Sequence, residues 1–104
     1  MFSSQEIQLR VKTGYIERLG SRLKKMRKQL IDRDWIGLKS EAGHVAEGAQ
    51  NFGYPDLAEE VEKALGVLEK RHLSRTAVDP DAKDALEKLF QKLDHFLVNE
   101  NEKQ

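Results

Sequence analysis

The clearest helical pattern of the chain lies in residues 34–53, which read DWIGLKSEAGHVAEGAQNFG. Their apolar members recur at alternating intervals of three and four residues, the spacing of one face of an α-helix: Trp35, Leu38, Ala42, Val45, Ala49 and Phe52. Asp34 suits the N-cap position of this helix, and Gly53 is typical of a residue that ends one. We therefore expect one amphipathic helix over this stretch.

The same periodicity predicts a helix before this stretch and two after it. The first runs from about Ser4 to Arg33, and a break at Thr13–Gly14 would leave a short extra helix at its start. The third has Pro55 in its first turn and fades around His72, and a loop follows over 73–78. The fourth begins at Asp79–Pro80. The apolar seams of these helices are Ile16, Leu19, Leu23, Met26 and Leu30 in the first, Leu57, Val61, Ala64, Leu65 and Leu68 in the third, and Ala82, Leu86, Leu89, Leu93, Phe96 and Leu97 in the fourth.

Length and connections predict one domain of all-α class. A chain of 104 residues is long enough for one domain rather than two, so we treat 1–104 as a single unit. The second and third predicted helices are joined by very few residues and must therefore form an antiparallel hairpin. The expected fold is an antiparallel four-helix bundle, with or without the short extra helix at the start.

Composition excludes several classes of function. The 18 basic and 18 acidic residues cancel, so no overall field attracts nucleic acid or a membrane surface. The chain has no cysteine, and therefore no disulfide framework or thiolate chemistry. No apolar run has the length of a membrane span, and the start of the chain lacks a signal-peptide pattern. We expect a cytoplasmic protein or a domain cut from a larger one.

His44 stands apart from the apolar stripe of its helix. At 100° per residue it points about 130° away from the centre of that stripe, so it should face solvent. Its surface neighbours lie three, four or seven residues away: Gly37, Ser40, Glu41, Glu47, Gly48 and Asn51. Glycine inside a helix costs about 0.5–1 kcal/mol relative to alanine, and this helix has three. Close approach by a second protein would explain that cost, whereas an ordinary surface histidine with incidental glycines is the alternative.

An exposed imidazole can carry a phosphoryl group. Near neutral pH, one nitrogen of a histidine ring is free to attack while the other keeps its proton. Transfer between two proteins needs in-line positioning and little else from the carrier. His44 is therefore a candidate phosphoryl acceptor.

The stretch GHVAEGAQNFG, residues 43–53, resembles the phosphorylation helix of histidine-phosphotransfer domains. His44, Gly48, Ala49 and Gly53 match that pattern in type and spacing. The flanking segments RDWIGLKSEA and LAEEVEKALGVLE are also similar to the family, so the resemblance covers about residues 15–69. It implies a phosphoryl carrier without catalytic activity of its own.

The resemblance also implies the site and its partners. His44 would accept the phosphoryl group on Nε2, Ser40 and Gly48 would provide clearance, and the other surface neighbours of His44 would line a docking rim. The partners would be response-regulator receiver domains or a hybrid sensor kinase. The carrier itself would need no cofactor or metal, because Mg²⁺ is expected on the receiver.

One residue departs from the family pattern. A lysine normally follows the phosphorylated histidine by three residues, but Glu47 occupies that position here. A carboxylate one turn from a phosphohistidine would repel it, and Glu41 makes the expected surroundings more acidic still. Lys63 or Arg22 is predicted at the level of His44 and could replace the missing lysine. Otherwise the chain is a helical adaptor that binds receiver or other signalling domains without transferring a phosphoryl group.

Two other readings fit the sequence less well. Glu41-x-x-His44 and Glu69-x-x-His72 resemble the paired ligands of a dinuclear iron centre. The expected register separates the two histidines by roughly 14 Å along the bundle, whereas the metal ions of such a centre lie roughly 4 Å apart. The basic residues between Arg18 and Arg33 alternate with the apolar seam and lack stacking aromatics, so they indicate a solvated helix face rather than a nucleic-acid site.

Overall fold

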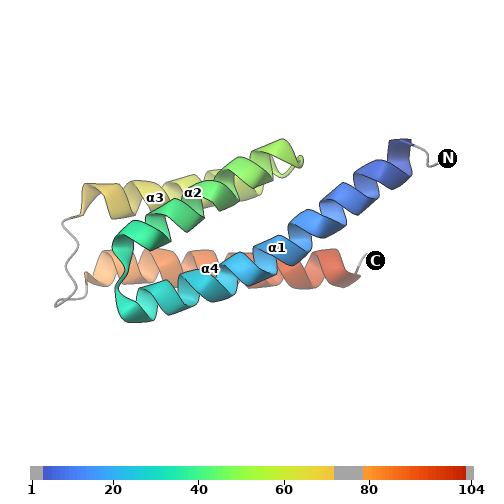
Figure 1. Cartoon of the computed structure of the whole chain (residues 1–104). Coiled ribbons are helices and arrows are strands. Elements are labelled where there is room, and N and C mark those ends of the chain that lie inside the picture. The colour runs from blue at the N-terminus through green and yellow to red at the C-terminus, as the bar shows by residue number, and fades with distance from the viewer. Residues whose placement is uncertain (1–3, 72–78, 103–104) are drawn as a thin grey trace.

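The chain folds into four helices and, over the residues described, contains no strand. The computed structural model describes residues 4–71 and 79–102, with side chains described over 13–71 and 79–100. The helices are α1 (Ser4–Asp32), α2 (Trp35–Asn51), α3 (Pro55–Lys70) and α4 (Pro80–Glu102). The predicted all-α class is confirmed (Figure 1).

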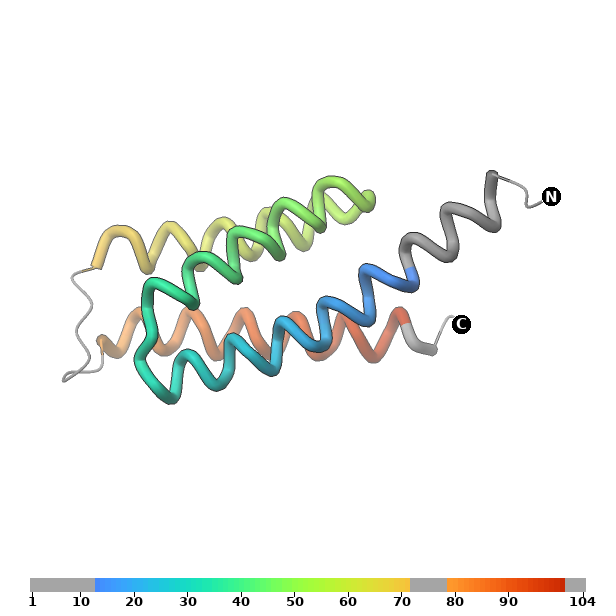
Figure 2. Tube along the Cα trace, viewed as in Figure 1, coloured from blue at the N-terminus to red at the C-terminus, as the bar shows by residue number. Residues whose placement is uncertain are grey.

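The four helices lie lengthwise beside one another (Figure 2). α1 packs against α2 and α4, and α3 packs against the same two helices. Buried side chains from all four helices form one hydrophobic cluster, which includes Leu19, Leu38, Val61 and Leu86. The arrangement is compatible with a four-helix bundle. None of the helices described is both long enough and apolar enough to cross a membrane.

The expected helix ends are confirmed at α2 and α4. The Asp34 side chain accepts a hydrogen bond from the Gly37 backbone N–H at 3.1 Å and so caps α2. Gly53 has a φ of +85°, a conformation that glycine adopts without steric cost, and it follows Phe52, the C-cap residue of α2. Asp79 Oδ1 caps α4 by accepting from Asp81 N and Ala82 N at 2.9 and 3.0 Å.

The possible break at Thr13–Gly14 is wrong, because α1 is continuous from Ser4 to Asp32. A glycine inside a helix costs only about 1 kcal/mol. Tyr15 and Ile16 follow directly and are buried in the core, so packing compensates for that cost. The predicted loop at 73–78 and His72 lie outside the described residues.

The predicted seams form the core. Their members on α1–α4 are buried except for five that are partly buried and pack against the core: Leu30, Phe52, Leu65, Phe96 and Leu97. Tyr54, which is in none of the predicted seams, packs against the core in the same way. The core also contains Tyr15, Ala46, Ala58 and Phe90, which the seams did not include. These residues extend the apolar stripes sideways, as expected for helices that each contact two neighbours.

Candidate functional site

The outer side of α2 is exposed, and His44 lies near its middle. The exposed residues of α2 are Ile36, Ser40, His44, Glu47, Gln50 and Asn51, which we call the exposed face of α2. The opposite side carries the buried residues Trp35, Leu38, Ala42, Val45, Ala46 and Ala49. The prediction that His44 faces solvent is therefore confirmed, as is the exposure of Ser40, Glu47 and Asn51.

Ile36 is a member of this face that the sequence reasoning missed. Its side chain is 85% exposed, although isoleucine is usually a core residue. It precedes His44 by eight residues and lies one turn before Ser40. Its position could have predicted this exposure, because Ile36 directly follows the seam residue Trp35 and is not itself part of the apolar seam.

Two of the three glycines of α2 have neighbours within the fold at the place where a Cβ would lie. A Cβ at position 48 would lie 2.8 Å from Cε2 of Tyr15, which packs onto α2 from α1. A Cβ at position 37 would lie 2.6 Å from Gln29 Nε2 and would also meet the capping side chain of Asp34. Packing against Tyr15 therefore accounts for the glycine at position 48 without a partner, whereas the atoms near position 37 are the ends of side chains that can shift.

Gly43 is different from the other two. A Cβ built on it would meet nothing within 4 Å. Gly43 directly precedes His44, so the backbone next to the imidazole carries no side chain there. No other part of the fold occupies the space that a side chain at position 43 would take. The bare backbone expected next to His44 is therefore supplied by Gly43 rather than by Gly48.

Tyr15 of α1 contacts the end of α2 that follows His44. Its hydroxyl donates a hydrogen bond to the carbonyl oxygen of Val45 at 3.4 Å. Its ring stacks on Phe52 with a centroid separation of 4.9 Å. Burial raises the pKa of Tyr15 to about 12, with the neighbouring Tyr54 adding to the effect and Arg22 opposing it. The carbonyl that Tyr15 binds belongs to the residue next to His44, so this contact anchors the helix at the candidate site.

Glu41 does not lie on a surface rim as expected, because it is buried between two cations of α1. Its carboxylate lies 2.8 Å from Arg22 Nη1 and 2.7 Å from Lys25 Nζ. These partners hold the pKa of Glu41 below its ordinary value, with the hydrogen bond from Lys25 the largest cause; desolvation opposes the shift, and Arg22 reinforces it. Lys25 belongs to the basic run predicted around the level of His44 but was not singled out, although it follows Arg22 by three residues and so shares its helix face.

The two other charged candidates are placed differently. Arg22, predicted at the level of His44, does reach α2, where it binds Glu41. Lys63 forms ion pairs with Glu59 and Glu60 of its own helix, at 3.6 and 3.7 Å. The structure therefore brings Arg22 and Glu41 together at the candidate site and engages Lys63 along α3.

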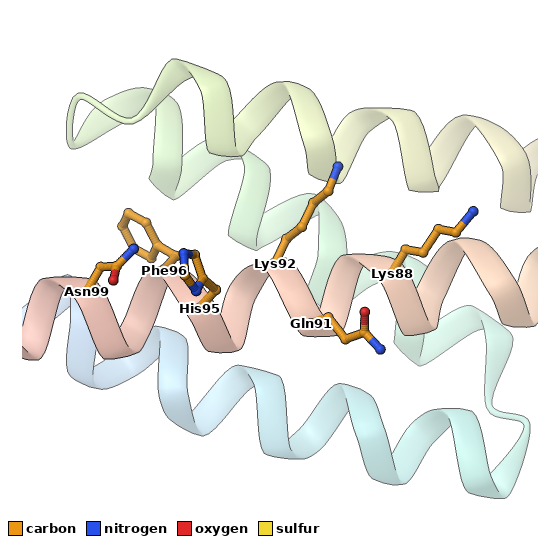
Figure 3. Close-up of a pocket in the computed structure, with 6 residues that line it drawn as sticks. All are labelled: Lys88, Gln91, Lys92, His95, Phe96 and Asn99. Carbon is orange, nitrogen blue, oxygen red and sulfur yellow. The ribbon is translucent and has the colours of Figure 1, made fainter.

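Shallow hollows lie elsewhere on the surface. One of about 410 Å³ is lined by Lys88, Gln91, Lys92, His95, Phe96 and Asn99. All six belong to α4, with Lys92 extending toward α3 and Gln91 on the other side of the helix (Figure 3). A second hollow, of about 360 Å³, shares Phe96 and adds residues around the turn between α2 and α3. Neither includes a residue of the exposed face of α2.

No arrangement typical of a metal centre occurs in the described part of the chain. Within residues 13–71 and 79–100, no three His, Asp or Glu side chains are grouped so that they could hold a metal ion. Glu41, one member of the two Glu-x-x-His pairs, is engaged by Arg22 and Lys25, while His72 lies outside the described residues.

The site thus combines an exposed imidazole, bare backbone at Gly43 and two cations that bind Glu41, the residue one turn before His44. Such a site can present a nucleophilic nitrogen to another protein and can stabilise a negative charge placed on it. Comparison with known proteins returns no matching family model, no matching curated protein and no matching solved structure.

Proposed function

We propose that this chain is a phosphorelay carrier, in which His44 accepts a phosphoryl group from the aspartate of one receiver domain and passes it to another. The observation that carries the proposal is the exposure of His44 in the middle of the outer side of α2. The resemblance of residues 43–53 to the phosphorylation helix of histidine-phosphotransfer domains supports it. The residues proposed below for the docking surface are chosen because they lie on α2 around His44.

The chemistry of the step needs only the imidazole from this chain. Nε2 of neutral His44 attacks the phosphorus of the receiver's aspartyl phosphate, and the N–P bond forms as the O–P bond breaks. The aspartyl oxygen leaves with the electron pair as a carboxylate, while Nδ1 of His44 keeps its proton. The return step reverses these changes. Mg²⁺ bound to the receiver would offset the charge of the phosphoryl oxygens.

The docking surface in this proposal is the exposed face of α2. Burying Ile36 against the receiver would supply apolar contact area. Gly43 would allow the receiver to approach the backbone beside His44. Ser40, Glu47 and Asn51 would form a polar rim around this contact, as interfaces usually have.

We further infer that the four helices form an antiparallel bundle. Only Arg33 and Asp34 separate α1 from α2, and only three residues separate α2 from α3. Connections this short join helices that run in opposite directions. A cytoplasmic location belongs to the same proposal, since a chain without cysteine suits a reducing compartment.

Phosphotransfer from a panel of purified, phosphorylated receivers tests the proposal directly. At least one receiver should label the chain with an acid-labile, base-stable phosphoryl group. His44→Ala should abolish this label while circular dichroism stays unchanged. His95→Ala, which removes another exposed histidine, is the matched control and should leave labelling intact. Labelling that persists in His44→Ala would refute the assignment.

The second candidate function is a helical adaptor that binds receiver domains without accepting a phosphoryl group. Glu47 favours it, because an exposed carboxylate one turn after His44 opposes the charge of a phosphohistidine. The same receiver panel separates the two functions. Receiver binding that His44→Ala leaves unchanged, with no labelling of the unmodified chain, would favour the adaptor.

A further inference from the structure

Around Glu41, negative charge is buried and positive charge is exposed. The Glu41 side chain is only 11% exposed, whereas those of Arg22 and Lys25 are 38% and 62% exposed. Seen from solvent, this part of the boundary between α1 and α2 is therefore cationic. Two positive charges face one negative charge, so the three side chains together carry a net positive charge.

This cluster lies beside His44. Glu41 precedes His44 by three residues, and residues three apart are neighbours on the surface of a helix. Their separation along the helix axis is about 4.5 Å. Arg22 and Lys25 of α1 therefore both bind, at hydrogen-bonding distance, the carboxylate of the residue one helical turn before His44.

The tether matters because both cations have long side chains. An arginine or lysine that orders itself around an anion loses rotamer freedom, which weakens the interaction. Here that freedom is already restricted by Glu41. Both cations are still partly exposed, so donors remain available for an incoming anion. A phosphoryl group carries a charge of about −1.5 to −2 and strong acceptor oxygens, and it can accept charge-assisted hydrogen bonds from such donors.

We propose that Glu41 is a positioning residue that holds Arg22 and Lys25 beside His44, where the two cations neutralise the phosphoryl group on its imidazole. This inference rests on the proposed function and deepens it. In this inference, α1 supplies the positive charge that Glu47 cannot supply. The Glu41 carboxylate then favours the phosphohistidine by holding cations, instead of repelling it. Arg18 of α1, which lies 5.9 Å from the Phe52 ring centroid, and Glu47 of α2 are the further charges nearby.

A small phosphodonor tests the inference on the whole chain without a partner. Phosphoramidate transfers its phosphoryl group to a histidine nitrogen, with loss of ammonia, and the decay of the phosphohistidine is then followed by ³¹P NMR. Arg22→Gln and Lys25→Gln should each shorten its half-life several-fold. Lys24→Gln and Lys28→Gln, which remove exposed cations from the same helix, are the matched controls and should leave the half-life unchanged.

The positioning role of Glu41 is measured by a double-mutant cycle. In the Glu41→Ala background, Arg22 is no longer tethered, so adding Arg22→Gln should change the half-life much less than it does in the unmodified chain. An Arg22→Gln effect of equal size in both backgrounds would overturn the role of Glu41. Circular dichroism on all variants separates this result from unfolding.

The outcomes distinguish the inference from the proposed function. If no receiver labels the chain but the half-life of chemically phosphorylated His44 depends on Arg22 and Lys25, the cluster stands and the relay fails. If receivers do label His44 but both variants decay like the controls, the relay stands and the cluster is overturned. Failure of phosphoramidate to modify His44 would also overturn the cluster, because a site that neutralises phosphoryl oxygens should retain the product.

Discussion

The ring of Tyr15 occupies the space that a side chain at Gly48 would need. A Cβ at position 48 would lie 2.8 Å from Cε2 of Tyr15, closer than real Cβ contacts come. Tyr15 thereby packs directly against the backbone of α2, and its hydroxyl reaches the carbonyl of Val45 at 3.4 Å. One glycine thus lets α1 hold the helix that carries His44.

Gly48→Ala should destabilise the fold, and Gly43→Ala should stabilise it. Both substitutions gain about 0.5–1 kcal/mol of helix propensity. At position 48, overpacking against Tyr15 costs typically about 1–3 kcal/mol, so a net loss of about 1 kcal/mol is expected. At position 43 the added methyl meets nothing within 4 Å, so the gain remains. Urea denaturation of the two variants measures both changes.

Equal stabilisation by the two alanines would contradict this account of Tyr15 and Gly48. The comparison also decides how clearance around His44 is tested. A large residue at position 48 would disturb the packing of α1 on α2, whereas Gly43→Gln adds bulk beside His44 into open space. Gly43→Gln should therefore weaken receiver binding without a loss of stability.

The pKa of Tyr15 predicts a loss of stability at high pH. It is raised from 10.0 to about 12 in the folded chain. Between these values the unfolded chain has lost the phenolic proton and the folded chain has kept it, so the free energy of unfolding falls as pH rises. Two pKa units correspond to about 3 kcal/mol, an upper bound for this group.

Tyr15→Phe isolates this contribution. The effects of high pH on the rest of the chain are common to both proteins and cancel in the difference. The stability advantage of the unmodified chain over Tyr15→Phe should therefore shrink from pH 10 to pH 12. Parallel denaturation curves for the two proteins across that range would show that Tyr15 keeps an ordinary pKa.

Glu47→Lys should lengthen the lifetime of the phosphohistidine or speed phosphotransfer. It replaces an exposed carboxylate one turn after His44 by a cation that can pair with the phosphoryl oxygens. We expect a change of about threefold to tenfold, the effect of roughly 0.7–1.4 kcal/mol. Gln50→Lys, on the same exposed face, is the control for a change in net charge alone. If Glu47→Lys changes neither rate, the cations of α1 already neutralise the site.

Ile36→Ser should weaken receiver binding by about tenfold. Its side chain is 85% exposed, and burying an isoleucine in an interface contributes about 1.5–3 kcal/mol. Ile31→Ser is the matched control, because Ile31 is 80% exposed but belongs to α1. Isothermal titration with a cognate receiver should show a loss for the first variant only. Equal losses for both variants would place the contact at the turn between α1 and α2 rather than on α2.

Much of the fold could be predicted from local patterns. Asp34 and Gly53 delimit α2 in the sequence as they do in the structure, since an N-cap carboxylate and a left-handed glycine act on the few residues beside them. The seam from Trp35 to Ala49 is buried as its periodicity predicted. The exposure of His44 follows from the same periodicity. Once the apolar face of α2 packs against the core, residues on the opposite side of the helix must face solvent.

What the sequence alone determined is therefore the helices, their buried faces and the outward direction of His44, all set by interactions within a few residues. Tertiary structure decided the rest of the site. Glu41 counts as a surface residue on the helix wheel, but Arg22 and Lys25 of α1 cover it and compensate its charge. In the sequence, Gly48 suggests backbone open to a partner. In the fold, the ring of Tyr15, which lies 33 residues earlier in the chain, packs against it. Both outcomes depend on which face of α1 meets α2, and that is fixed only when the four helices bury their stripes together.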